Sequence, residues 1–540
     1  MTAKPFVALG LDFGTESVRA VLVDGGGVER GSAVARYRHG QITESLPKSR
    51  DRLPADYALQ HPQDWLDSSA SAVRAAMRRA RLKSGDVVGI GVDFTSCTML
   101  PTQSDGTPLC LSKEFAREPL AWPKLWKHHG AKQQADRMTE IANRRKESFL
   151  QDYGGTIGLE WFFPKVLETL ENAPRVYAAS EVWLEAGDWF VWQLVGGPAS
   201  ELPRSTCQAG YKALWSRETG FPSTGYLKAV HPELANVVRD KLPGRFLSPG
   251  EVAGGLGSDI AKRMGLTAGI PVSAAVIDAH AGVPGAGAAE PGTLVMVLGT
   301  SSCHMINATE RGNVPGVCGV VEGGILPGLF GYETGQAAVG DAFDWLRRTV
   351  GHRNFDKLNE FARAVAPGAD GVRCLDWMNG CRTPLMDGHL RGAFTGLTLH
   401  HEPQHLYRAL MEGSAFGVRW IVELLRENGV PVKRFVATGG LPHHNPLLVE
   451  IYADVLGEPI SVHPSKNGPA LGAAILGALA AGERTGFRTA EAAVRAMAAP
   501  KRGVPGRESH VVRPNRSHRA AYDAAYDEYQ ALADSFGRKA

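Results

Sequence analysis

Two short turns in the sequence carry small and hydroxyl-bearing residues between apolar runs, and the first also carries an acid. In the stretch FVALGLDFGTESVRAVLVD (6–24), Asp12 precedes Gly14, Thr15 and Ser17, and apolar runs flank the turn. Such runs around a Gly- and Ser-containing turn are typical of a β-hairpin. Its backbone N–H groups and hydroxyls could bind an anion, and a divalent cation could bridge that anion to Asp12. The stretch fits a Mg²⁺-nucleotide, and an ordinary hairpin with a turn-capping aspartate explains it equally well.

A second stretch, GTLVMVLGTSSCHMI (292–306), repeats the pattern of apolar run, Gly-Thr-Ser-Ser turn and return strand. One such hairpin is a weak signal, but two, far apart in one chain, indicate two related halves that close on one nucleotide. This pattern resembles the superfamily of sugar kinases, actin and heat-shock ATPases. The resemblance implies an α/β fold with two actin-like (ribonuclease H-like) ATPase domains and a central interdomain cleft.

Other polar residues stand where predicted strands end, which is where open α/β sheets place their ligands. Asp278 follows the strand expected at 270–277, and Ser96 follows the strand expected at 87–92. A carboxylate at position 278 could reach into an interdomain cleft, or it could cap the next helix. Lys212 lies among Tyr, Leu and Trp residues, so we expect a partly buried amine there rather than a surface lysine.

Composition limits the classes of function. At 540 residues, the chain is long enough for two or more domains. A net charge of +3 favours neither nucleic acid nor an anionic membrane. The basic cluster at 74–83 fits a solvated helix face, and the adjacent His128 and His129 lack the i, i+4 spacing of a helical metal site.

The cysteines and the apolar runs suggest a compartment. Seven cysteines without a C-x-x-C pair suit a reducing environment without structural zinc. The chain reaches Asp12 before a signal-peptide core could form. The run at 470–482 is too short to span a bilayer. We therefore expect a cytoplasmic protein with no membrane or nucleic-acid partner, and a homodimer is left open.

The second half contains further candidate elements. ETGQ (333–336) leads into a helix at 337–349, and Phe435–Gly440 is a strand followed by two glycines. Glycines between a strand and a helix let a base or phosphate approach the backbone. A terminal helix is expected at 520–536, and its tyrosines, Tyr522, Tyr526 and Tyr529, are interpreted as packing residues only.

Taken in order, these segments resemble the FGGY carbohydrate kinases from about residue 6 to about 485. The matching segments are LDFGT with Arg19, the strand-end Asp278, LGTSS, ETGQAAVGDAFDWL, TGGLPHHNPLL and ALGAAILGA. Together they are a strong signal, and any one alone is weak. The resemblance implies an N-terminal, sugar-binding domain at 1–282 and a C-terminal, nucleotide-binding domain at 283–540 that includes the helical tail.

The resemblance also implies roles, residue by residue. Asp278 is the expected general base, and Asp12 and Asp278 would orient Mg²⁺. The sugar would be held by Ser96, Lys212, Asp278 and Glu333. The phosphates of ATP would be cradled by Gly14, Thr15, Arg19, Gly299, Thr300 and Ser301. The adenosine would be framed by Gly340, Asp344, Gly439, Gly440 and Asn445.

Within the family, several segments resemble the ribulokinase branch, which phosphorylates L-ribulose at its 5-hydroxyl in arabinose catabolism. They are LPADYALQHPQDW, GVDFTSCTMLP, AWPKLWKHHG, LEWFFPK and QAGYKALW. The family's first signature is poorly matched around Trp161–Lys165, so the role of that segment stays open. Two alternatives remain: another ketose or polyol kinase (D-ribulose, xylulose, ribitol or glycerol), and an ATPase switch of the actin or chaperone type.

Overall fold

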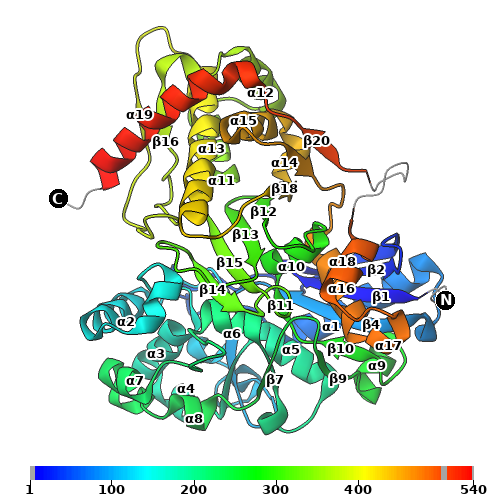
Figure 1. Cartoon of the computed structure of the whole chain (residues 1–540). Helices are drawn as coiled ribbons and strands as arrows, with labels where there is room; N and C mark the ends of the chain where they lie inside the picture. The colour runs from blue at the N-terminus through cyan, green and yellow to red at the C-terminus, as the bar shows by residue number, and fades with distance from the viewer. Residues whose placement is uncertain (1–5, 500–507, 538–540) are drawn as a thin grey trace.

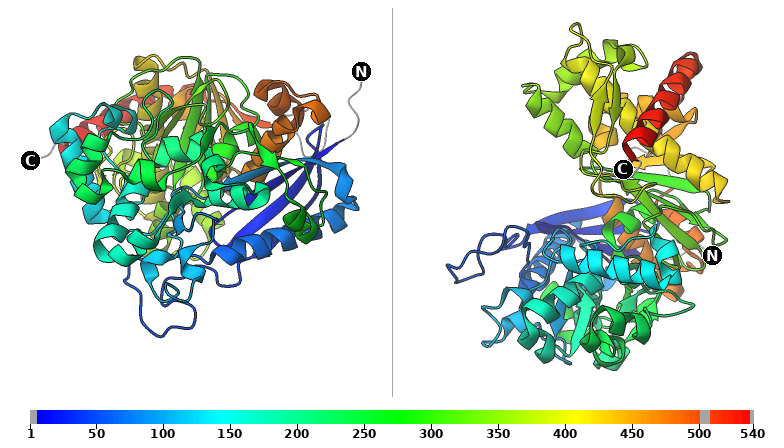
Figure 2. Two further views of the ribbon diagram at one scale, coloured as in Figure 1. Left: turned by 90° about the horizontal axis from the view of Figure 1, so that it is seen from below. Right: turned by 90° about the vertical axis from the view of Figure 1, so that its left-hand side faces the viewer.

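The structure is a computed structural model that describes residues 6–499 and 508–537. Two lobes, each built around a seven-stranded sheet, lie one above the other in Figure 1 and in the right view of Figure 2. The strand order of the first sheet is β3-β2-β1-β4-β10-β9, with β11 beside β4. The order of the second sheet is β14-β15-β13-β12-β18-β19-β20.

The strands of the first sheet are β1 (Val7–Phe13), β2 (Ser17–Asp24), β3 (Glu29–Arg36), β4 (Val87–Phe94), β9 (Val252–Gly255), β10 (Pro271–Ser273) and β11 (Val276–Ile277). Those of the second are β12 (Thr293–Leu298), β13 (Ser302–Ala308), β14 (Gly319–Glu322), β15 (Phe330–Gln336), β18 (Arg434–Thr438), β19 (Ile460–Val462) and β20 (His510–Val512). The remaining strands form three two-stranded pairs: β5 (Met99–Thr102) with β6 (Val182–Glu185), β7 (Pro203–Ser205) with β8 (Arg245–Leu247), and β16 (Arg373–Leu375) with β17 (Ala393–Thr395).

The helices up to residue 264 are α1 (Pro62–Ala80), α2 (Lys132–Arg145), α3 (Phe162–Asn172), α4 (Pro174–Ala179), α5 (Ala186–Val195), α6 (Thr206–Lys212), α7 (Thr224–Val230), α8 (Val237–Lys241) and α9 (Ser258–Met264). The later ones are α10 (Asp278–Gly285), α11 (Gly340–Thr349), α12 (Phe355–Ala364), α13 (Pro403–Glu427), α14 (Leu441–His444), α15 (Pro446–Leu456), α16 (Gly468–Ala480), α17 (Gly482–Thr485), α18 (Ala490–Met497) and α19 (Arg519–Gly537).

The two sheets share an internal plan. In the first, β1 pairs antiparallel with β2 and parallel with β4. In the second, β12 pairs antiparallel with β13 and parallel with β18. The predicted phosphate turns are the β1–β2 and β12–β13 connections, so the expectation of two related halves is confirmed.

One helix from the second half of the chain packs on the first sheet. Helix α16 packs against β1 and β4 of the first sheet, although it follows the second sheet in the chain. It also crosses α10, and the fit is tight because a Cβ on Gly472 would lie 1.8 Å from Ala281 O. The predicted domain boundary after residue 282 falls inside α10.

Two further observations concern the helices and the cysteines. None of the helices found in residues 6–499 and 508–537 is long and apolar enough to cross a membrane. All seven cysteines are free thiols, and six of them are buried.

Candidate active site

The tip of the first hairpin is held by side chains from its own lobe. Gly14 N donates to Ser17 O at 3.0 Å, which closes the turn. Tyr37 Oη donates to Gly14 O at 3.1 Å, and Gln60 Nε2 donates to Thr15 O at 2.7 Å. The half-exposed Trp126 donates from its indole Nε1 to Thr15 Oγ1 at 3.1 Å. The turn carrying Gly14 and Thr15 is therefore positioned by three separate segments.

The tip of the second hairpin is held by a helix N-terminus. Gly299 N donates to Ser301 O at 3.0 Å, as in the first turn. Gly340 N, at the start of α11, donates to Gly299 O at 3.0 Å. The neighbouring amides of Val339 and Asp341 both donate to Thr300 O, at 2.9 and 3.1 Å. All of these contacts to the Gly299–Ser301 turn are made by backbone groups.

Among the glycines assigned to nucleotide binding, the structure separates two environments. A Cβ built on Gly14, Gly299 or Gly440 would meet no protein atom closer than 3.5 Å. A Cβ on Gly340 would lie 2.6 Å from Gly299 O, and one on Gly439 would lie 2.4 Å from Leu298 O. The first group leaves room for a ligand beside the backbone, whereas the second is required by close packing of the chain on itself.

Three aspartates face one another at the ends of β1, β4 and β11. The register pairs Asp12 with Asp93 across β1 and β4, and β11 ends beside β4 directly before Asp278. Burial raises the pKa of Asp93 well above its usual range, and the charges of Asp12 and Asp278 raise it further. No N–H or O–H donor in the described chain reaches either Asp93 oxygen. A protonated Asp93 can donate to Asp12.

The other two acids are less enclosed. Burial raises the pKa of Asp12 despite Arg19, whose Nη1 lies 3.3 Å from Asp12 Oδ2. Burial also raises the pKa of the partly exposed Asp278 to about 7, against the hydrogen bond from Ala279 N at 2.7 Å. A general base works best with a pKa near the operating pH. The set fits Mg²⁺, because oxygen ligands with excess negative charge are what this ion binds.

A buried ion pair joins the two lobes next to these acids. Lys212 at the end of α6 lies 2.9 Å from Glu333 on β15, and both side chains are less than one-tenth exposed. Burial alone would lower the pKa of Lys212 and raise that of Glu333, but their mutual attraction reverses both shifts. Both groups are therefore charged at neutral pH. His280 Nε2 lies 3.3 Å from Glu333, and burial lowers its pKa, so it faces the pair as a neutral ring.

Ser96 stands at the tip of a strained loop. The next residue, Cys97, has a φ of 56°, which is unusual for a non-glycine residue and costs about 1–3 kcal/mol. The fully buried Lys165 holds this loop, because its Nζ donates to Cys97 O at 2.7 Å and to Leu125 O at 2.8 Å. Lys165 thus connects Ser96 to the segment that carries Trp126.

The structure brings together most, but not all, of the predicted site. Asp12, Lys212, Asp278 and Glu333 lie where the two lobes meet, and Ser96 follows the end of β4, the strand between β1 and β11. Asp344 is part-exposed on α11 and pairs with Arg347 and Arg348 at 2.7 and 3.0 Å. Asn445 is buried, and its Oδ1 accepts from Leu448 N at 3.2 Å as the N-cap of α15. The last two have structural partners, and their predicted contacts with adenosine stay predictions.

Several polar residues of this region were not assigned a role from the sequence. Asp93 sits inside a run of apolar strand residues, and Lys165 opens a helix in the poorly matched segment. Arg382, whose Nη1 lies 3.9 Å from Cys303 Sγ, belongs to the long connection between β15 and β18. One sequence signal could have identified Asp93: an acidic residue within an apolar strand is costly to bury, so its presence there indicates a function.

Comparison with known proteins agrees with this geometry. Residues 7–285 match the N-terminal domain of the FGGY family of carbohydrate kinases, and residues 294–481 match its C-terminal domain. A ribulokinase of Bacillus licheniformis is 42% identical over 537 residues, which cover 97% of this chain and 95% of that protein. A ribulokinase of Mycolicibacterium smegmatis is 44% identical over 549 residues, which cover 99% and 94%.

Solved structures show the same fold at low sequence identity. A xylulose kinase from Rhodospirillum rubrum has a TM-score of 0.78 at 23% identity, covering 98% of this chain and 99% of that one. Plasmodium falciparum glycerol kinase with ADP has a TM-score of 0.77 at 16% identity, with 99% of each chain covered. The expected two-domain α/β kinase fold is confirmed. Two family matches that span most of the chain, and relatives above 40% identity over nearly all of it, show that the chain belongs to the FGGY family of carbohydrate kinases.

Proposed function

We propose that this enzyme transfers the γ-phosphoryl group of ATP to the 5-hydroxyl of L-ribulose. The observation that carries the proposal is the buried Lys212–Glu333 pair, supplied by both lobes beside the strand-end Asp278. Lys212 can donate to a sugar hydroxyl and Glu333 can accept from one. The ribulokinase names of the similar proteins support L-ribulose as the acceptor.

The chemistry follows from the positions of the charges. Asp278 accepts the proton of the 5-hydroxyl, the hydroxyl oxygen attacks the γ-phosphorus, and the bond to the leaving ADP oxygen breaks. The open faces of Gly14 and Gly299 would let backbone N–H groups approach the phosphates from both hairpins. Such positioning supplies most of phosphoryl-transfer catalysis.

Asp12 and Asp278 would hold Mg²⁺, with Asp93 behind them as a protonated neighbour. When bound, the cation neutralises charge on the phosphates. Arg19 stays beside Asp12 and adds a positive charge to the first hairpin.

For the binding roles of the two parts of the chain, we propose the division that the sequence predicts. Residues 1–282 would bind the sugar and residues 283–540 the nucleotide, with Glu333 reaching the sugar from the second part. Gly340, Asp344, Gly439, Gly440 and Asn445 would lie around the adenosine. We expect the enzyme to act in the cytoplasm on a small-molecule sugar, and a homodimer is left open.

The test is an ADP-release assay with a panel of acceptors: L-ribulose, D-ribulose, D-xylulose, ribitol and glycerol. We expect the highest kcat/KM with L-ribulose and a product phosphorylated at C5 by NMR. Lys212→Met should damage kcat/KM for the sugar and spare ADP binding, whereas Lys228→Met, at an exposed lysine on α7, should change neither. A better rate with D-xylulose or glycerol would contradict the ribulose assignment, and ADP release without any sugar would contradict the kinase assignment.

A further inference from the structure

The C-terminal helix α19 lies beyond both matched family regions, the second of which ends at residue 481. It packs against β16, α15 and α13 in the upper lobe (Figure 1). The prediction that its tyrosines serve only for packing is wrong, because all three hydroxyls have polar partners. Tyr522 Oη accepts from Arg408 at 2.7 Å, Tyr526 Oη donates to Glu423 at 2.7 Å, and Tyr529 Oη donates to Asp376 Oδ1 at 2.9 Å.

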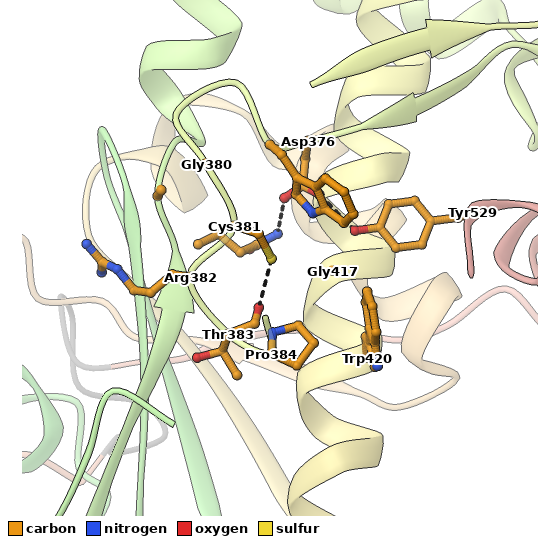
Figure 3. Close-up of a pocket in the computed structure, with 12 residues that line it drawn as sticks. Asp376, Gly380, Cys381, Arg382, Thr383, Pro384, Gly417, Trp420 and Tyr529 are labelled. Carbon is orange, nitrogen blue, oxygen red and sulfur yellow. Dashed lines mark hydrogen bonds between the residues drawn. The ribbon is translucent and has the colours of Figure 1, made fainter. Parts of the chain in front are cut away.

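Only the third of these contacts leads toward the active site. Figure 3 shows the Tyr529 hydroxyl pointing at Asp376 at the edge of a small pocket that Gly417 and Trp420 of α13 also line. The second Asp376 oxygen accepts from Gln336 Nε2 at 2.8 Å. Both donors help keep Asp376 ionised, although burial still raises its pKa to about 6. Asp376 therefore accepts one hydrogen bond from α19 and one from the end of β15.

Gln336 connects Asp376 to the second hairpin by hydrogen bonds. Its other Nε2 hydrogen bond goes to Ser414 O on α13, at 2.8 Å. Because both amide hydrogens are used on this side, Oε1 must face the hairpin, where it accepts from Ser302 Oγ at 3.2 Å. His304 Nε2 lies 3.0 Å from the same hydroxyl, and the pKa of His304 is lowered to about 4 by burial, so the ring is neutral.

Close packing makes this arrangement specific. A Cβ on Gly417 would lie 2.5 Å from Gln336 Nε2, so only a glycine on α13 leaves space for the amide. Ser302 is the first residue of β13 and directly follows Ser301 of the turn. Displacement of Ser302 would therefore move the turn that we assign to the phosphates.

We propose that Tyr529 is a positioning residue for the second phosphate hairpin, acting through Asp376, Gln336 and Ser302. The helix α19 is thereby part of the nucleotide side of the enzyme rather than a passive tail. The proposal rests on the proposed function in one respect, namely that the Gly299–Ser301 turn contacts ATP.

The test compares two tyrosines of the same helix. Tyr529→Phe removes the hydroxyl that leads to the hairpin, and Tyr526→Phe removes a hydroxyl whose partner, Glu423, lies on the outer side of α13. For each variant we would measure the melting temperature, the KM values for ATP and L-ribulose, and the Kd for ADP by calorimetry. We expect Tyr529→Phe to raise the KM for ATP and the Kd for ADP about threefold or more, with the KM for L-ribulose unchanged.

Tyr526→Phe should lower the melting temperature to a similar extent and leave both nucleotide constants unchanged. Equal effects of the two variants on nucleotide binding, or no effect of Tyr529→Phe, would overturn the proposal. A shift of the KM for sugar equal to that for ATP would also overturn it, because a general loosening of the lobe would then explain the result.

A double-mutant cycle with Ser302→Ala tests the path itself. If Tyr529 acts through Ser302, the effects of the two substitutions on the Kd for ADP will not add, since either one breaks the same chain. Additive effects would overturn the path. Failure of the proposed function would look different, because the wild-type protein would then bind no ADP or would release ADP without sugar.

Discussion

The two phosphate hairpins share a backbone plan but differ in how they are held and in what surrounds them. The first is held by the side chains of Tyr37, Gln60 and Trp126, and three carboxylates lie beside it. The second is held by the amides at the start of α11, and its turn carries hydroxyls but no acid. The first hairpin therefore lies beside carboxylates, and the second forms a cradle of backbone groups.

The largest difference between the two hairpin regions is expected for substitution of Asp278. We expect Asp278→Asn to lower kcat about 10²–10⁴-fold, because a general base is lost from the acidic side. Ser301→Ala in the other turn should cost much less, because the backbone amides that hold and form that cradle remain. Steady-state kinetics with ADP binding as a folding control would measure both. A near-normal kcat for Asp278→Asn would remove this residue from the chemistry.

The backbone cradle is tested with two glycines that touch each other. Gly299→Ala adds a methyl group on an open face, so we expect about a tenfold to hundredfold higher KM for ATP with little change in stability. Gly340→Ala places a methyl group 2.6 Å from Gly299 O, and it should lower the free energy of unfolding by about 1–3 kcal/mol. Kinetics and chemical denaturation separate the two results. If Gly299→Ala raised the KM values for sugar and ATP equally, Gly299 would serve the fold instead.

A smaller effect is expected at the link between the first hairpin and the sugar residues. Lys165→Met removes the ammonium that donates to Cys97 O and Leu125 O, and it should lower kcat/KM for the sugar about tenfold. The matched control is Lys124→Met, since the Nζ of the equally buried Lys124 donates to Leu120 O, at 2.7 Å, and not to the Ser96 loop. The two variants should lose similar stability. Equal kinetic effects would show that Lys165 supports the lobe in general rather than the Ser96 loop.

The smallest effect is expected for Trp126, one of the side chains that hold the first turn by a hydrogen bond. Trp126→Phe removes the indole donor to Thr15 Oγ1 at a half-exposed site, so we expect only about a twofold to fivefold lower kcat/KM. The loss should appear in the KM for ATP or for the sugar and not in the melting temperature. A loss above a hundredfold would mean that Trp126 contacts a substrate directly.

Local sequence patterns were enough to predict the parts that are continuous in the chain. Both hairpins, the strand before Asp278 and the buried amine of Lys212 are found as expected, because each depends on a few neighbouring residues. Family resemblance named Glu333 as a sugar-binding residue, but its pairing with Lys212 was not predicted, since the two lie 121 positions apart.

What could not be predicted depends on contacts between distant segments. The sequence around Lys165 looks like the start of any helix, and its two carbonyl partners lie in loops 68 and 40 positions away. The hydroxyl of Tyr529 likewise finds Asp376 across 153 positions. An apolar ring with one polar atom gives no local sign of whether that atom is used.

The position of helix α16 has a consequence for any attempt to divide the protein. Close approaches of Gly10 to Ala470 O and of Gly91 to Ala473 O mean that α16 covers the middle of the first sheet. A fragment that stopped at residue 285 would bare that surface to water, although it would contain the entire N-terminal family match. Each half has its own hairpin motif, but we expect that the two halves must be expressed and refolded together.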